Sequence, residues 1–297
     1  MTATTNVLFD TLGPRASRRS LIASVVIGVT VATILSVVLY RLVQAGQFTE
    51  AKLGPFFNPT NEDFMVTWQF LGHGLLNTLI VATLALVLSL AAGTFLAVCR
   101  VSAAPWYRWI IVTVIEVLRA VPVVLLIYAV SRILPVINAP LSLMWYLIIG
   151  IVLYSSVAIA EIIRSGISAL PKGQTEAALS LGLSNFDLLR LVVLPQAFKL
   201  MLPALISQLV IVLKETSLGF VISFEELLRR GQMAIQTLHN PLQMYFVIGL
   251  IYVIINLAIT RIAREAESRI LNKTHRSKKG FRRASPVPSM NVSEHVS

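Results

Sequence analysis

Four stretches of this chain contain at least 20 consecutive residues without a charged side chain: Leu21–Tyr40, Gly74–Val98, Leu141–Ala160 and Pro241–Thr260. A helix rises about 1.5 Å per residue, so 20 residues cover about 30 Å, the thickness of the hydrocarbon core of a bilayer. Only 13% of the residues are charged, whereas soluble domains have about a quarter. The runs therefore predict membrane-spanning helices and argue against an ordinary soluble enzyme.

Two further apolar stretches are interrupted by charges and by proline. A proline removes a backbone donor and kinks a helix, so neighbouring helices must satisfy the freed carbonyls. We therefore expect both stretches to be interior helices, which gives an all-α membrane protein with six transmembrane helices and both termini on one side. They are Trp109–Ser131, with Glu116, Arg119 and Pro122, and Leu200–Phe224, with Pro203, Lys214 and Glu215.

The distribution of Lys and Arg predicts which side faces the cytoplasm, because basic residues near the ends of spans are retained there. With the amino terminus inside, eighteen basic residues lie in inner segments and only Lys52, Arg132, Arg229 and Arg230 lie in outer ones. We expect a membrane protein with both termini cytoplasmic. The net charge of +11 then faces anionic lipid, which argues against nucleic-acid binding.

The spans and the charges divide the chain into five expected segments. Residues 1–20 form a cytoplasmic amino-terminal segment, 21–41 a first helix, 42–71 an outer loop and 72–264 a helical membrane domain. Residues 265–297 are basic and then rich in Ser and Pro, with too few apolar residues to form a core, so we expect a disordered cytoplasmic tail.

The only sizeable inner loop, at about residues 165–197, has the signals of two short helices. Pro171 suits a first helical turn, and Gly182 can end the first helix in a left-handed conformation. Ser184 predicts the cap of the second helix, with Asp187 three residues later as a capping box, and Pro195 predicts its end. Such a pair could transmit force from a cytoplasmic partner, or it could be an amphipathic linker on the membrane surface. Spacing alone favours the linker.

The residues of this loop carry a resemblance to a known family. Glu176, Ala177 and Ala178, followed by Gly182 and then by Leu194 and Pro195, resemble the EAA loop of bacterial ABC importer permeases. Val192 stands where isoleucine is usual in that loop. The resemblance implies that these residues dock on a separate ATPase, which would bind the ATP and Mg, so no cofactor is expected on this chain.

Three other segments resemble the permeases of the histidine, glutamine and glutamate group. They extend the resemblance over about residues 72–263, and within the group the chain is most similar to the permeases of actinobacterial glutamate importers. One departure is Ala120-Val121, where the group commonly has Gly-Thr. The segments are Glu116–Pro122, Glu161–Gly166 and Lys214–Leu218.

The resemblance implies a five-helix permease core, to which the first helix is an addition. It implies an importer that takes up a polar amino acid, most closely glutamate, delivered by an outer solute-binding protein. It also implies a second permease subunit and favours one that is not identical to this chain.

Five charged residues lie in or at the edges of the apolar stretches, where an unpaired charge is costly. Arg119 or Lys214 could meet substrate carboxylates in the translocation path. The alternative is structural pairing, of Arg119 with Glu116 one helical turn away and of Lys214 with a neighbouring acid, and we favour this alternative. The five are Glu116, Arg119, Glu161, Lys214 and Glu215.

The sequence leaves two other functions as alternatives to an importer subunit. A secondary transporter more often has internal repeats and more spans. A membrane-embedded enzyme needs catalytic groups within the spans, yet all three aspartates fall outside them and the chain has a single cysteine, so neither a catalytic site nor a metal site is predicted. Lys172-Gly173-Gln174-Thr175 reverses the order of a Walker motif, so ATP hydrolysis would need a partner.

Overall fold

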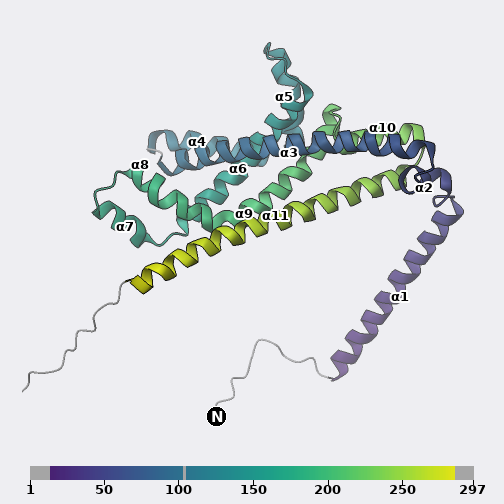
Figure 1. The fold of residues 1–297 in the computed structure, drawn as a ribbon, viewed down its shortest axis with the longest axis horizontal. Coiled ribbons are helices and arrows are strands. Elements are labelled where there is room, and N and C mark those ends of the chain that lie inside the picture. Colours follow the sequence, from purple (N-terminus) through teal and green to yellow (C-terminus); the bar gives the residue numbers. More distant parts are fainter. Residues whose placement is uncertain (1–13, 103–104, 285–297) are drawn as a thin grey trace, which may run out of the picture.

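The computed structural model describes residues 14–102 and 105–284, and within these ranges the regular structure is helical, without strands (Figure 1). The helices in chain order are α1 (Pro14–Gln44), α2 (Glu50–Phe57), α3 (Glu62–Ser102), α4 (Pro105–Ala120), α5 (Val123–Val136), α6 (Leu143–Ser168), α7 (Lys172–Ser180), α8 (Asn185–Asp187), a π-helical turn (Leu188–Val193), α9 (Leu194–Glu215), a 3-10 turn (Thr216–Ile222), α10 (Leu227–Leu238) and α11 (Pro241–Ala284).

The prediction of an all-α membrane protein is confirmed, and the expected count of six spans is approximately met. Among the described residues, five helical segments are long and apolar enough to cross a bilayer, and α4 with α5, which meet at a bend of 105°, make a sixth if the pair counts as one span. The bend falls at Val121 and Pro122, where Pro122 precedes the first residue of α5. Proline restricts the residue before it to extended conformations, so the helix must break there.

The centre of the bundle is formed by α3, α6 and α9, with α5 against α6 (Figure 1). Small residues permit the closest crossings, as is common between helices in membranes. A β-carbon at Gly93 of α3 would lie 2.7 Å from the carbonyl oxygen of Ser156 on α6. One at Gly150 of α6 would lie 2.6 Å from the Cα of Ile127 on α5. Larger side chains at either glycine would push these helices apart.

Two ends of the bundle are distinguished by their connections. The α7 end holds α7, α8 and the carboxyl-terminal ends of α3, α6 and α11, and the α10 end holds α2, α10 and the amino-terminal ends of α3 and α11 (Figure 1). At the α10 end, α2 lies within the segment expected to be an outer loop, and α3 begins at Glu62, ten residues before the expected start of the membrane domain at 72.

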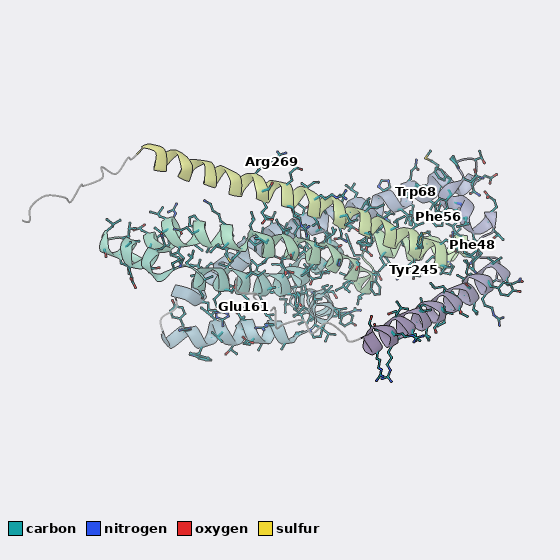
Figure 2. All side chains as sticks on the ribbon, turned by 90° about the horizontal axis from the view of Figure 1, so that it is seen from below. Phe48, Phe56, Trp68, Glu161, Tyr245 and Arg269 are labelled. Carbon is teal, nitrogen blue, oxygen red and sulfur yellow. The ribbon has the colours of Figure 1, made fainter. Side chains whose placement is uncertain are left out.

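The first helix is separate from the bundle. Both views show α1 diverging from the other helices (Figures 1 and 2), and none of its apolar window is buried. The turn that follows α1 contacts the core, where the side-chain amide of Gln243 donates a hydrogen bond to the backbone carbonyl of Gln47. The extra helix is therefore an attachment to the core rather than part of it.

The helix α11 continues to Ala284, into the segment from residue 265 for which the sequence predicts disorder. The segment extends an existing helix, so it needs no new nucleus, and it contains many good helix formers. Glu265 and Arg269 add an ion pair at i, i+4 with an N–O distance of 2.8 Å. The rest of the expected tail, residues 285–297, lies outside the described residues, as do residues 1–13 of the expected amino-terminal segment.

Candidate functional site

The first candidate site is the helical hairpin formed by α7, α8 and the π-helical turn. Its turn has the geometry predicted for Gly182, whose φ is 80°. The Gly182 amide donates to the Leu179 carbonyl at 2.9 Å, and the Leu183 amide donates to the Ala178 carbonyl at 3.3 Å. These two bonds form a Schellman motif, which fixes the direction in which the chain leaves α7.

The start of the second helix is also as predicted, but its end is not. The Asp187 amide donates to Ser184 Oγ at 3.1 Å, and the Ser184 hydroxyl donates to the Asp187 carboxylate at 2.6 Å. The prediction that Pro195 ends this helix is wrong, because α8 continues through the π-helical turn into α9. Pro195 lies where the π-helical turn joins α9, and the helix continues through it although proline has no N–H to donate.

The hairpin is anchored to the bundle by an apolar cluster. Ala178, Leu188, Leu189 and Val193 are buried together, and side chains from α3 and from the end of α6 pack against them. The link to α9 is continuous helix. A displacement of the hairpin would therefore be transmitted to α9 and α6 rather than absorbed by a loose loop.

The tip of the hairpin exposes large apolar side chains that the sequence analysis did not identify. Leu181 is 84% exposed and Phe186 is 66% exposed, and they lie on either side of the Gly182 turn. Glu176 and Ala177 are also exposed. Exposed apolar side chains that cluster on a rigid element are typical of a protein contact. The sequence indicates this contact surface, because it places large apolar residues beside a turn glycine, where they cannot form part of a core.

The second candidate site contains the charged residues of the spans. Glu161 of α6 forms ion pairs with Arg100 of α3 and with Arg164 one turn along α6, the latter at 2.9 Å. The sequence does not identify Arg100 as a partner of Glu161, because the two residues are 61 positions apart. This three-residue network joins α3 to α6 just before the hairpin.

Arg119 and Glu116 come together as the i, i+3 alternative predicted, with an N–O distance of 3.8 Å. Both side chains are more than half exposed, at 61% and 55%. Arg119 also lines a cavity of about 280 Å³ with Tyr154 and Glu161. The structure thus brings Arg119 and Glu161 to one cavity, and Glu116 lies beside it as the ion-pair partner of Arg119.

Lys214 and Glu215 are adjacent in sequence but have different environments. Lys214 is exposed on α9, and among the described residues it has no ion pair, so the predicted pairing with a neighbouring acid is not found. Glu215 is buried and accepts a hydrogen bond from Ser155 Oγ of α6 at 3.0 Å. Of the two, only Lys214 is available to a group outside this chain.

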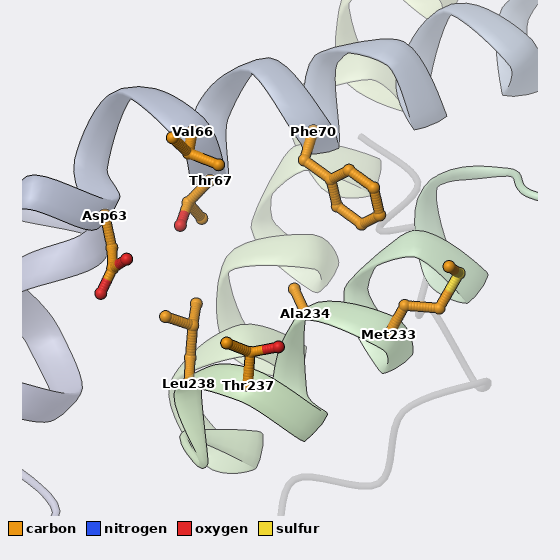
Figure 3. A pocket seen from close by; sticks show the side chains of 8 residues that line it. All are labelled: Asp63, Val66, Thr67, Phe70, Met233, Ala234, Thr237 and Leu238. Carbon is orange, nitrogen blue, oxygen red and sulfur yellow. The ribbon is translucent and has the colours of Figure 1, made fainter.

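A cavity of about 310 Å³ at the α10 end contains none of the residues predicted as sites. It lies between the start of α3 and α10, with Asp63, Thr67 and Phe70 facing Met233 and Thr237 (Figure 3). Within the ranges 14–102 and 105–284, no group of three or more His, Cys, Asp or Glu side chains is placed to hold a metal ion.

Comparisons with known proteins agree with this geometry. The family model described as a binding-protein-dependent transport system inner membrane component matches residues 89–272. The glutamate transport system permease protein GluD of Corynebacterium glutamicum is 38% identical over 76% of this chain and 82% of its own length. The arginine transport system permease protein ArtQ of Bacillus subtilis is 32% identical over 71% of this chain and 98% of its own length.

The fold is also similar to solved structures. The crystal structure of an amino acid ABC transporter with histidines matches with a TM-score of 0.64 and 29% identity, and covers 71% of this chain and 99% of that chain. A chain from inward-facing conformations of the MetNI methionine ABC transporter matches with a TM-score of 0.60 at 15% identity, over 72% of this chain and 99% of that chain. At 15% identity, the similarity to the MetNI chain shows a shared fold and nothing more.

Proposed function

We propose a detailed transport role for a chain that belongs to the family of binding-protein-dependent transport system inner membrane components. The chain is an ABC importer permease for amino acids, and this replaces the secondary transporter and the membrane-embedded enzyme considered from the sequence. Its proposed cargo is glutamate. The observation that supports glutamate is the 38% identity to the glutamate permease GluD over 76% of the chain.

The α7 end is proposed to face the cytoplasm of a bacterial cell, and the α10 end the outside of its plasma membrane. The excess of Lys and Arg in the segments at the α7 end supports this orientation. A solute-binding protein would then deliver the amino acid at the α10 end. Both termini would be cytoplasmic.

The hairpin is the proposed contact with a separate ATPase subunit. Its exposed tip, with Glu176, Leu181 and Phe186, offers apolar anchors beside a charge. Its anchored base and its helical continuity with α9 support a lever-like movement when the ATPase subunits close. Ala177, Ala178, Gly182, Leu194 and Pro195 would set the shape of this contact and of its link to the bundle.

This chain is proposed to hold no nucleotide of its own. Purified alone, the chain should hydrolyse ATP no faster than background. The complex with its ATPase subunit should hydrolyse ATP above background, and the loaded binding protein should change this rate. Steady ATP hydrolysis by the isolated chain would contradict the proposal that a separate subunit hydrolyses ATP. A second permease subunit, proposed to be non-identical, would complete the translocation path.

Arg119 and Lys214 are the proposed cations of the translocation path, because both are exposed and Arg119 lines a cavity. Arg119→Ala should remove transport while the stimulation of ATPase activity by the loaded binding protein persists. Glu116→Ala is the matched control, since it breaks the same 3.8 Å pair but leaves the cation. Equal loss in both variants would indicate that the pair acts only structurally.

The cargo is tested by uptake into vesicles that contain the complete transporter and its binding protein. Labelled glutamate should be taken up with ATP inside, and unlabelled glutamate should compete at least about tenfold better than glutamine or arginine, a difference of about 1.4 kcal/mol in binding. Equal or better competition by another amino acid would replace glutamate as the cargo and leave the importer role intact.

A further inference from the structure

A groove between α9 and α11 has the features of a phospholipid site. It has a volume of about 390 Å³ and is lined on the α9 side by Pro203, Ile206, Ser207, Val210 and Ile211. On the α11 side it is lined by Thr260, Arg264 and Glu267. It contains none of the residues discussed for coupling or for transport.

The groove crosses the boundary of the hydrocarbon region. The charge-free run of α11 ends at Thr260, and Arg264 lies four residues, or about 6 Å, beyond it. Since α9 runs antiparallel to α11 (Figure 1), the lining residues latest in α9, Val210 and Ile211, lie toward the Thr260 end of the groove, and both are apolar. One end of the groove therefore suits an acyl chain, and the other end lies at the level of a headgroup.

The polar end carries two charges that lack partners. Neither Arg264 nor Glu267 has an ion pair among the described residues, although Glu265 and Arg269 on the same helix pair with each other. The hydroxyls of Ser207 and Thr260 donate to carbonyls of their own helices, at 3.1 and 2.6 Å. Arg264 and Glu267 are thus the charged groups of the lining that remain available to a ligand.

The order of Arg264 and Glu267 along α11 favours one class of phospholipid. Arg264 is the nearer to the hydrocarbon, and Glu267 lies three residues, or about 4.5 Å, further out. An ethanolamine headgroup has the same order, with its phosphate next to the glycerol and its ammonium beyond it. A guanidinium binds phosphate by charge-assisted hydrogen bonds, and a carboxylate accepts them from a primary ammonium.

We propose that this groove binds one phosphatidylethanolamine molecule, with its phosphate at Arg264, its ammonium at Glu267 and an acyl chain along Ile206, Val210 and Ile211. A phosphatidylglycerol would satisfy Arg264 but leave Glu267 facing a neutral headgroup. A phosphatidylcholine would place a quaternary ammonium, which has no N–H to donate, at Glu267. The proposal concerns lipid retention and does not depend on which amino acid is transported.

The test is native mass spectrometry of the complete transporter after reconstitution in bilayers of equal parts phosphatidylethanolamine, phosphatidylglycerol and phosphatidylcholine. One phosphatidylethanolamine should remain bound to this chain, about tenfold above the other two lipids, as expected for a charge-assisted pair. Arg264→Ala should remove retention of phosphatidylethanolamine and phosphatidylglycerol. Glu267→Gln should remove the preference between those two.

Two matched variants make the test specific. Arg261→Ala removes an exposed basic residue of α11 that does not line the groove, and retention should be unchanged. Val210→Phe fills the apolar end and should lower retention without changing a charge. Equal retention of all three lipids, or no effect of Arg264→Ala and Val210→Phe, would overturn the proposal. A crosslink from Ser207→Cys to another subunit within the groove would do so too, because a protein segment would then occupy it.

Discussion

At the scale of single residues, Gly182 is a position where a side chain would strain the backbone without a steric clash. Its φ is 80°, yet a β-carbon there would have no neighbour within 4 Å. Gly182→Val should abolish uptake while membrane insertion persists, because a β-branched residue in this conformation costs about 1–2 kcal/mol and favours another direction of the chain. The measurement is uptake together with the amount of protein in the membrane.

Two substitutions serve as controls for Gly182. Gly182→Asn should retain part of the uptake, since asparagine tolerates left-handed conformations. Gly173→Val lies in α7 without a positive φ and without a neighbour in reach, so it should retain most of it. Normal uptake by Gly182→Val would contradict the role of the hairpin in coupling.

The ion pairs of Glu161 should contribute to the stability of the protein. Glu161→Gln should destabilise the protein by about 2 kcal/mol, because it leaves Arg100, whose side chain is only 17% exposed, without its counter-charge. The change should appear as a lower melting temperature of the purified complex. Glu116→Gln, which alters an exposed pair at 3.8 Å, should change stability by less than about 0.5 kcal/mol. Equal effects would contradict the distinction between the two pairs.

At the scale of helices, α10 depends on a buried carboxylate at its start. Glu226 is fully buried, its carboxylate accepts hydrogen bonds from the Leu228 and Arg229 amides at 2.8 and 2.7 Å, and the Tyr252 hydroxyl of α11 donates to it at 3.0 Å. Burial raises the pKa of Glu226 from 4.5 to about 7, while these hydrogen bonds act to lower it. The same residue thus caps α10 and joins it to α11.

This pKa predicts how stability changes with pH. A raised pKa means that the folded state binds the proton more tightly, so the contribution of Glu226 is complete below pH 4.5 and is lost as the pH rises through about 7. The melting temperature should fall from roughly pH 5 to pH 8, by an amount equivalent to about 2 kcal/mol. Glu226→Gln, which stays neutral, should flatten this slope. An unchanged slope in the variant would assign the pH dependence to other groups.

At the scale of the whole molecule, α1 is a separable part. Since none of its apolar window is buried against the bundle, removal of residues 1–44 should shift the melting temperature of the remaining core by less than about 2 °C. Ile159→Ala, at a fully buried position, should instead cost about 2–4 kcal/mol. A large loss of stability on removal of α1 would mean that it packs on the core in the membrane.

The sequence predicted the spans and the hairpin turn well, and the charge contacts poorly. Long apolar runs and a glycine after a helix are local signals that depend on neighbours within a few residues, as Leu21–Tyr40 and Gly182 show. The pairing of Arg100 with Glu161 and the burial of Glu215 beside Ser155 depend on how α3, α6 and α9 cross. No spacing along the chain contains that information.

The sequence by itself determined that this chain crosses a membrane, about how often, and where the hairpin of α7 and α8 turns, because bilayer thickness and backbone conformation act on each segment separately. The tertiary structure alone decided that α8 continues through Pro195 into α9, that Lys214 is exposed while Glu215 is buried, and that Arg264 and Glu267 share a groove with α9. Those outcomes follow from helix packing, in which glycines such as Gly93 and Gly150 set how closely helices approach.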